Sequence, residues 1–162
     1  MMSEHDVERF FETLISGDRT AARTIVNDHL EAGLPPEDLL IELYWPTQEM
    51  VERLHRNDQL TNLAHHYATR MLRVLVDQTA ARFVFEETKN KRVLAFCGPS
   101  DPEELTGQMA VDLLELSGFD VKFAGGGIPR DEILAQVADF RRHGIGCTTV
   151  GLGVGAYNDA LL

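Results

Sequence analysis

Three histidines in the first half of the chain are the side chains best suited to metal or ligand chemistry. His55 stands alone, whereas His65 and His66 are adjacent. A neutral imidazole can ligate a transition metal, and its nitrogens can hydrogen-bond an amide or a carboxylate at the rim of a ligand. On a helix, His65 and His66 would point about 100° apart, so they cannot easily share one ligand face. Ordinary surface or helix-packing positions are therefore the alternative interpretation of this pair.

A glycine-rich loop and the start of the helix before it form a second candidate group. A loop without side chains lets a bulky ligand approach the backbone, although a tight turn between a strand and a helix explains the same glycines. Glu104 has its own alternative, as an acid that the helix dipole stabilises in a first turn. A cofactor-binding role for this group is implied by a resemblance to a known family, and its members are Glu104, Thr106, Gly107, Gly125, Gly126 and Gly127.

Independent catalysis finds little support in the sequence. We identify no convincing set of Ser, His and Asp, no Cys and His pair, and no phosphate-binding loop. We therefore expect a protein that binds a ligand rather than an enzyme.

The elements that must position these residues divide the chain into two parts. Apolar residues recur at helical spacing up to about residue 88, with a bend expected at Pro46. Helices joined by short loops form a bundle, so this part is predicted to be a four-helix cap domain, residues 1–88. The four expected helices span residues 7–15, 20–32, 35–54 and 60–87.

The periodicity changes after the linker at residues 88–91. Short apolar runs then alternate with helical segments, which is the pattern of a parallel sheet with crossover helices. We therefore expect an α/β domain over residues 91–162. Its strands are predicted over 93–97, 120–124 and 147–154, and its helices over 102–117 and 131–142.

Residues 107–129, GQMAVDLLELSGFDVKFAGGGIP, carry a longer motif. This stretch resembles the cobalamin-binding modules of methionine synthase, of corrinoid methyltransferase proteins and of light-sensing transcriptional regulators. Their pattern is a glycine, an apolar helix, Gly-Phe/Trp-x-Val, and then Gly-x-x-Val/Ile-Pro. The resemblance implies an α/β fold, with a helical cap followed by a flavodoxin-like or Rossmann-like parallel segment.

The helical part contributes to the same resemblance. Residues 54–60 and 64–69, LHRNDQL and AHHYAT, are similar to the family's Leu-Trp-x-x-Gly-Glu-Ile and Glu-His-x-Ala segments. On this match His66 takes the place of the family's histidine and His65 replaces an acid. His55 stands where the light sensors have a tryptophan that shields the upper face of the corrin. The resemblance implies cobalamin as the cofactor, with haem as an alternative that one of these histidines would ligate.

The metal-binding loop departs from the family's pattern. The family has Asp-x-His-x-x-Gly, in which the histidine ligates cobalt from below. Counted back from Gly107, Pro102 stands at the aspartate position and Glu104 at the histidine position. A carboxylate is a hard oxygen ligand and a poor replacement for imidazole on cobalt. We therefore expect that any bound cobalamin has no protein histidine below the metal.

Composition and charge exclude several classes of protein. The net charge is -11, and phosphate backbones need clustered Lys and Arg, so we expect no direct binding of nucleic acid. No apolar stretch is long enough to cross a membrane, and the acidic start is unlike a secretory signal, so the expected location is cytoplasmic. Cys97 and Cys147 form no Cys-x-x-Cys pair and are expected to be reduced and buried.

The C-terminal part has residues for fewer strands than the family's five-stranded sheet. Either two elements are missing between Arg142 and Gly146, or the chain is truncated and carries an unrelated tail. An incomplete sheet exposes an edge that can pair with a second copy, so we expect a homodimer.

Three functions follow from these observations. The first is a sensor or regulatory protein that binds a tetrapyrrole between cap and α/β domain and signals to a regulatory protein partner. The second is an interaction module of the same fold without a ligand. The third is a corrinoid carrier subunit of a methyltransferase, against which the absent histidine counts most, because methyl transfer needs a controlled lower face on cobalt.

Overall fold

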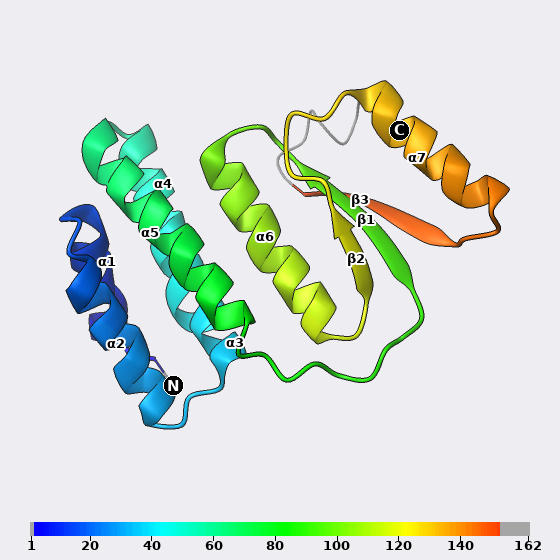
Figure 1. Cartoon of the computed structure of the whole chain (residues 1–162). Helices are drawn as coiled ribbons and strands as arrows, with labels where there is room; N and C mark the ends of the chain where they lie inside the picture. The colour runs from blue at the N-terminus through cyan, green and yellow to red at the C-terminus, as the bar shows by residue number, and fades with distance from the viewer. Residues whose placement is uncertain (1, 153–162) are drawn as a thin grey trace. The chain divides into compact units, whose positions relative to one another are not determined.

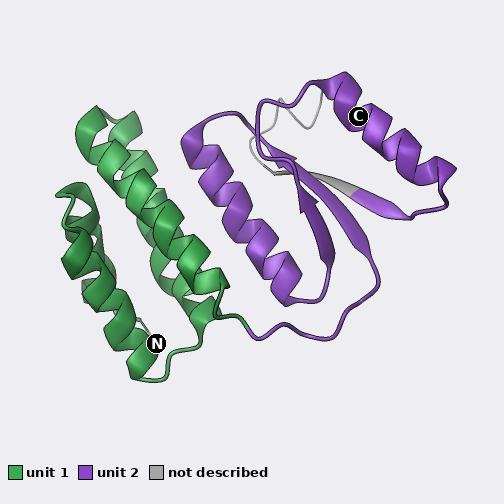
Figure 2. Ribbon diagram, viewed as in Figure 1, with its two compact units in different colours: residues 1–83 green, residues 84–162 purple. Residues whose placement is uncertain are grey.

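The chain divides after Phe83 into two folded units, residues 1–83 and 84–162, which are green and purple in Figure 2. The computed structural model describes residues 2–152. Residues 83–91 contain no helix or strand, and the predicted linker lies within this segment. The Glu86 N–H donates to Leu116 O and the Lys89 N–H to Gly118 O, both at 2.9 Å, which attaches the segment to the second unit.

The first unit consists of helices connected by short turns (Figure 1). Ser3 and Asp6 form a reciprocal capping box at the start of the first helix, and Asp18 and Thr61 cap two others, so polar side chains define where these helices begin. Within residues 2–83 there is no strand, which confirms the predicted helical fold. The helices are α1 (Glu4–Ile15), α2 (Arg19–Glu31), α3 (Pro36–Leu39), the π-helix η1 (Leu40–Tyr44), α4 (Trp45–Arg56) and α5 (Asn62–Ala80).

A π-helical turn lies directly before Pro46, where the sequence predicted a bend. The Trp45 N–H donates to Leu40 O, five residues back, where an α-helix would use the fourth. Proline has no N–H and its ring clashes with the preceding turn of an α-helix, and the wider π-turn accommodates both. The helical path continues through η1 into α4, with Leu40, Leu43 and Tyr44 of this turn buried.

The end of α5 corrects the prediction of a helix extending to about residue 87. The helix ends at Ala80, and the N–H groups of Arg82 and Phe83 close a turn on Thr79 O and Ala80 O. Beyond this turn the backbone forms its hydrogen bonds with the end of α6 instead. Apolar periodicity could not reveal whether these residues continue the helix or hydrogen-bond to the end of α6. The backbone N–H and C=O groups are satisfied in either conformation.

The second unit is a small parallel sheet with helices on both faces (Figure 1). β1 lies in the middle of the order β2-β1-β3, and both of its pairings are parallel, as predicted. Leu94 and Phe96 face α7, where they pack with Ile133 in one buried cluster. Gly107 of α6 packs beside Cys97, which points to the opposite face of the sheet. The elements are β1 (Arg92–Cys97), α6 (Asp101–Leu116), β2 (Asp120–Phe123), α7 (Arg130–Arg142) and β3 (Cys147–Leu152).

The two cysteines differ in exposure. Both are free thiols, but Cys97 is buried in the central strand whereas Cys147 is partly exposed. The prediction that both are buried is therefore wrong for Cys147, which begins the edge strand β3. The last two residues of the predicted third strand, 153 and 154, lie outside the described residues.

Candidate functional site

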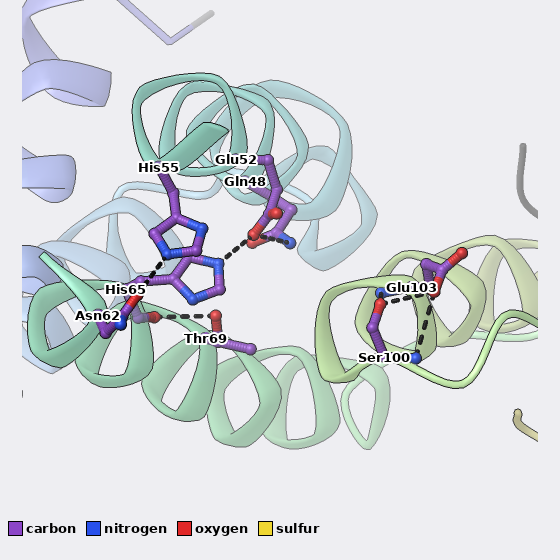
Figure 3. A network of polar contacts seen from close by, with 8 residues as sticks. All are labelled: Gln48, Glu52, His55, Asn62, His65, Thr69, Ser100 and Glu103. Carbon is purple, nitrogen blue, oxygen red and sulfur yellow. Dashed lines mark hydrogen bonds and ion pairs between the residues drawn. The ribbon is translucent and has the colours of Figure 1, made fainter. Parts of the chain in front are cut away.

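Two helices of the first unit bring their polar side chains together in one network (Figure 3). α4 contributes Gln48, Glu52 and His55, spaced so that they lie on one side of the helix. α5 contributes Asn62, His65 and Thr69 at equivalent spacing. The turn at residues 57–61 reverses the chain between the two helices, so these sides face each other.

The centre of this network is a stacked pair of histidines. The rings of His55 and His65 lie 3.9 Å apart between centroids and are inclined by 13°. His65 Nε2 lies 2.7 Å from Glu52 Oε1, and His55 Nε2 lies 2.8 Å from Asn62 Oδ1. Both partners are oxygen acceptors, so a neutral ring at either position would donate from Nε2 and have its lone pair on Nδ1. The geometry therefore leaves each ring one nitrogen that can ligate a metal or accept a hydrogen bond.

The structure separates His66 from this pair. His66 is exposed, and its ring meets His65 edge-on with centroids 6.1 Å apart and an interplanar angle of 73°. His65, by contrast, is buried. Adjacent residues of a helix diverge in this way, so the two histidines do not present one common ligand face.

Two buried side chains beside the network have polar atoms without a partner in residues 2–152. Thr47 and Gln48 are buried, yet Thr47 Oγ1 and Gln48 Oε1 make no hydrogen bond there. The Gln48 amide nitrogen does lie 3.5 Å from Glu52 Oε1, which orients its oxygen away from that carboxylate. A buried acceptor without a donor is costly, and a ligand or an ordered water that supplies an N–H or O–H would satisfy it.

Gln48, Glu52 and Asn62 were not among the predicted site residues. The sequence did contain a pattern that could have identified Gln48 and Glu52. Together with His55 they have the spacing of polar residues on one face of a helix. An amphipathic helix also has a polar face toward solvent, however, and the pattern does not distinguish solvent from a second polar helix.

In the second unit, Glu104 holds the glycine-rich loop. It lies in the first turn of α6, and its Oε1 accepts a hydrogen bond from the Gly126 N–H at 3.1 Å. The neighbouring residue Glu103 forms a capping box with Ser100 (Figure 3). Thr106 lies half-buried in the next part of the helix. Glu104 is therefore an acid near a helix N-terminus, as the alternative interpretation held, and it also fixes a loop that is distant in sequence.

The glycines of this region allow α6, the end of β1 and the loop at residues 125–127 to approach one another closely. A Cβ on Gly107 would lie 3.0 Å from the Phe123 ring, and a Cβ on Gly126 only 2.2 Å from the Gly98 carbonyl oxygen. Gly125 and Gly127 have positive φ angles of 72° and 74°. Among the described residues, no heavy atom would lie within 4 Å of a Cβ on Gly127, so residues 2–152 leave this side of the loop open. The loop is thus packed against the end of β1 on one side and accessible on the other.

Within residues 84–152, the side chain at the predicted ligand position does not fit a cobalt ion ligated by protein. Glu104, at the predicted ligand position, is a carboxylate bonded to backbone rather than an imidazole. Burial raises the pKa of the nearby Cys97 thiol to about 11, and the charges of Glu104 and Glu103 contribute to this rise. The thiol is therefore protonated at neutral pH as long as no metal is bound. In the part of the chain that the structure describes, no three His, Cys, Asp or Glu side chains gather as a metal site.

Among the helices within residues 2–152, none is both long and apolar enough to cross a membrane.

Comparison with known proteins relates the chain to corrinoid proteins. Residues 7–79 match the family model described as the B12 binding domain. No curated protein matches the chain. The solved structure of the monomethylamine corrinoid protein of Methanosarcina barkeri matches with a TM-score of 0.67 and 11% identity, over 98% of this chain and 74% of that one. The methanol:cobalamin methyltransferase complex of the same organism matches with a TM-score of 0.51 and 14% identity, over 94% and 74%.

At these identities the two structures establish the fold. The predicted helical cap with a Rossmann-like α/β segment is confirmed. The family match bears out the predicted relationship to cobalamin-binding modules for residues 7–79, and the solved structures bear out the fold.

Proposed function

We propose that the protein binds cobalamin and transmits its presence to a protein partner, because residues 7–79 match the B12 binding domain family. The family match is the observation that carries the cofactor, and it covers α4 and α5 with their histidine network. The fold of the second unit supports the same cofactor, since the matching structures are corrinoid proteins.

The helical unit offers groups that suit the rim of a corrin. Cobalamin carries peripheral amides, which donate and accept hydrogen bonds. The unpaired Gln48 Oε1 needs a donor, and the Nδ1 atoms of His55 and His65 can accept one. We propose that these residues hold and orient the ligand, and that Glu52 and Asn62 fix the two rings by accepting from Nε2.

The α/β unit is proposed to hold the ligand without ligating the metal. When bound, cobalamin supplies a cobalt whose reactivity depends on its axial ligands. Glu104 here fixes the loop at Gly126, and the open side at Gly127 leaves the backbone accessible. This arrangement favours a sensor or regulatory protein over an enzyme subunit, because methyl transfer would need a ligand such as imidazole on cobalt, and Glu104 is a carboxylate bonded to the Gly126 N–H.

The corrinoid carrier is the second candidate, and one observation favours it. Two of the matching structures are a monomethylamine corrinoid protein and a methanol:cobalamin methyltransferase complex. A carrier would work with a methyltransferase as its partner, whereas a sensor would change its association with a regulatory partner or a second copy when the ligand binds.

Titration of the full chain with hydroxocobalamin, followed by visible absorbance, tests the cofactor. We expect saturable binding that His65→Ala weakens at least tenfold, or roughly 1.4 kcal/mol. His5→Ala is the matched control, because His5 is exposed on α1 and outside the network. The same titration with His66→Ala decides whether the histidine identified by resemblance contributes. Haem is titrated in parallel, and a protein that binds neither compound is an interaction module without a ligand.

A second measurement separates sensor from carrier. Light scattering of the chain with and without cobalamin should reveal a ligand-dependent change of assembly if the protein is a sensor. Consumption of a methyl donor after addition of a methylamine or methanol methyltransferase, with no change of assembly, would support the carrier instead.

A further inference from the structure

Three apolar side chains lie on the side of α5 that faces away from the core of the helical unit. Leu63 is 61% exposed, Tyr67 43% and Val74 38%. Exposed apolar residues scattered singly are common, but three along one line of one helix indicate an interaction surface. The buried apolar residues on the opposite side of the same helix are Ala68, Leu72, Leu75 and Val76.

The spacing of these residues is that of a helix packed along one other helix. Leu63, Tyr67, Arg70 and Val74, which we call the α5 seam, are separated by four, three and four residues, like the a and d positions of a heptad. At 100° per residue the four positions fall within a sector of about 60°. A helix that packs on a globular core buries a wider sector, so the seam fits a single partner helix.

The α5 seam is complementary to itself when two copies of the helix run antiparallel. Leu63 and Val74 are equally distant from the midpoint between residues 68 and 69, and so are Tyr67 and Arg70. A two-fold axis through this midpoint places Leu63 of each copy opposite Val74 of the other. The same axis places each Tyr67 opposite the Arg70 of the other copy, as an isologous interface requires.

The pairing of Tyr67 with Arg70 is favourable electrostatically. Arg70 is exposed and forms no ion pair within residues 2–152. A guanidinium over a tyrosine ring contributes about 0.5–1 kcal/mol at an exposed site. The Tyr67 ring is already positioned by the turn after α1, because a Cβ on Gly17 would lie 3.3 Å from Tyr67 Cδ2. Little further ordering of this ring is needed for binding.

From this self-complementarity we propose that α5 pairs with α5 of a second copy in an antiparallel two-fold dimer. The surface belongs to the helical unit and is distinct from the sheet edge at which the sequence predicted a dimer. No member of the α5 seam belongs to the histidine network, so the dimer is measured without cobalamin. One helix from each copy makes an interface smaller than the usual 1,600 Å² or so, and we expect a Kd of roughly tens to hundreds of micromolar.

Sedimentation equilibrium of the full chain, at concentrations from about 5 to 500 micromolar, measures the dimer. Leu63→Lys and Val74→Glu should each weaken it at least about tenfold, because each places a charge opposite an apolar side chain. Two copies of net charge -11 repel each other, so added salt should strengthen the dimer of the natural chain by screening this repulsion.

The double variant L63K/V74E tests the antiparallel pairing itself. The introduced lysine of each copy lies opposite the introduced glutamate of the other, so most of the lost affinity should return. Within one helix the two positions are eleven residues apart, or roughly 16 Å, and the introduced charges cannot pair there. Recovery therefore requires the proposed arrangement of two copies.

Two substitutions of the aromatic residue separate ring chemistry from apolar contact. Tyr67→Phe should leave the dimer unchanged, because the ring face remains. Tyr67→Leu should weaken it about fivefold to thirtyfold, since each dimer loses two contacts between a guanidinium and a ring. Leu134→Glu is the matched control, because Leu134 is a 45% exposed leucine on α7, outside the α5 seam. Circular dichroism checks that each variant is folded.

Several results would overturn the proposal. A chain that stays monomeric over the whole concentration range has no such interface. Equal weakening by Leu134→Glu and Val74→Glu would place the contact on another surface, and so would an unchanged dimer in both Leu63→Lys and Val74→Glu. A double variant that dimerises no better than either single variant would refute the antiparallel pairing.

Discussion

Replacement of Gly126 by alanine tests how the glycine-rich loop is held against the end of β1. A Cβ at this position would lie 2.2 Å from the Gly98 carbonyl oxygen and 2.7 Å from Pro99 Cα. Both are backbone atoms, so no side chain can rotate away. Ordinary contacts between non-bonded atoms are about 3.5 Å, and the loop must therefore move by roughly 1 Å.

The cost of this movement follows from the hydrogen bonds that it breaks. The Gly126 N–H donates to Glu104 Oε1 at 3.1 Å, and the Cys97 N–H donates to Gly125 O at 3.0 Å. A bond to a charged group contributes about 1.5–3 kcal/mol and a neutral one about 0.5–1.5 kcal/mol. We expect Gly126→Ala to lower the free energy of unfolding of the α/β unit by about 2–4 kcal/mol.

Hydrogen exchange followed by mass spectrometry measures this loss in the affected unit alone. Peptides covering β1 should exchange roughly thirtyfold to a thousandfold faster in Gly126→Ala, since about 1.4 kcal/mol corresponds to a factor of ten. Peptides from α1 to α5 serve as the internal control and should be unchanged.

Two other glycines provide matched controls. Among the described residues, no heavy atom would lie within 4 Å of a Cβ on Gly146, and its φ is not positive, so Gly146→Ala should change stability by less than about 0.5 kcal/mol. Gly127 also has open space but a φ of 74°, so Gly127→Ala should cost about 1–2 kcal/mol from backbone strain alone. If Gly126→Ala exchanges no faster than Gly146→Ala, the close contact with Gly98 does not hold the loop and the reasoning is refuted.

Three further predictions concern titration, thiol reactivity and the absent cobalt ligand. Burial raises the pKa of Tyr44 to about 12 from 10.0, against smaller opposing effects of Thr79 and Arg82. The helical unit should therefore keep its full stability below pH 10 and lose about 2–3 kcal/mol as the pH rises toward 12. Urea unfolding followed by the single tryptophan should show this loss, and Tyr44→Phe should remove the pH dependence. Iodoacetamide at about pH 8 should alkylate the partly exposed Cys147 at least about tenfold faster than the buried Cys97, as peptide mass spectrometry would measure, and equal rates would contradict the burial of Cys97. The visible spectrum of bound cobalamin should be the same in Glu104→Ala as in the natural chain, because Glu104 bonds the loop, whereas Glu104→His should introduce an imidazole ligand and shift the spectrum.

Local sequence patterns were sufficient to predict the fold class and the order of helices and strands. Helical spacing of apolar residues up to about residue 88, followed by short apolar runs between glycines, indicated helices and then a parallel sheet. These patterns are reliable because each element buries its own apolar face. The spacing of apolar residues along that one segment therefore indicates whether it is a helix or a strand.

The same patterns could not show where competing backbone interactions end an element. α5 stops at Ala80 because the following residues hydrogen-bond to the end of α6, which is distant in sequence. The π-turn before Pro46 is similar, since proline predicts a disturbance of the helix but not how the chain accommodates it.

The sequence by itself provided the candidate residues, and the tertiary structure decided which of them act together. Spacing identified His55, His65 and His66 but could not select the stacked pair, because stacking depends on how α4 and α5 pack. Resemblance placed Glu104 at a ligand position, whereas its bond to Gly126 joins residues 22 apart in the chain. Side-chain pairing of this kind depends on distances across the fold, and no local pattern of residues encodes those distances.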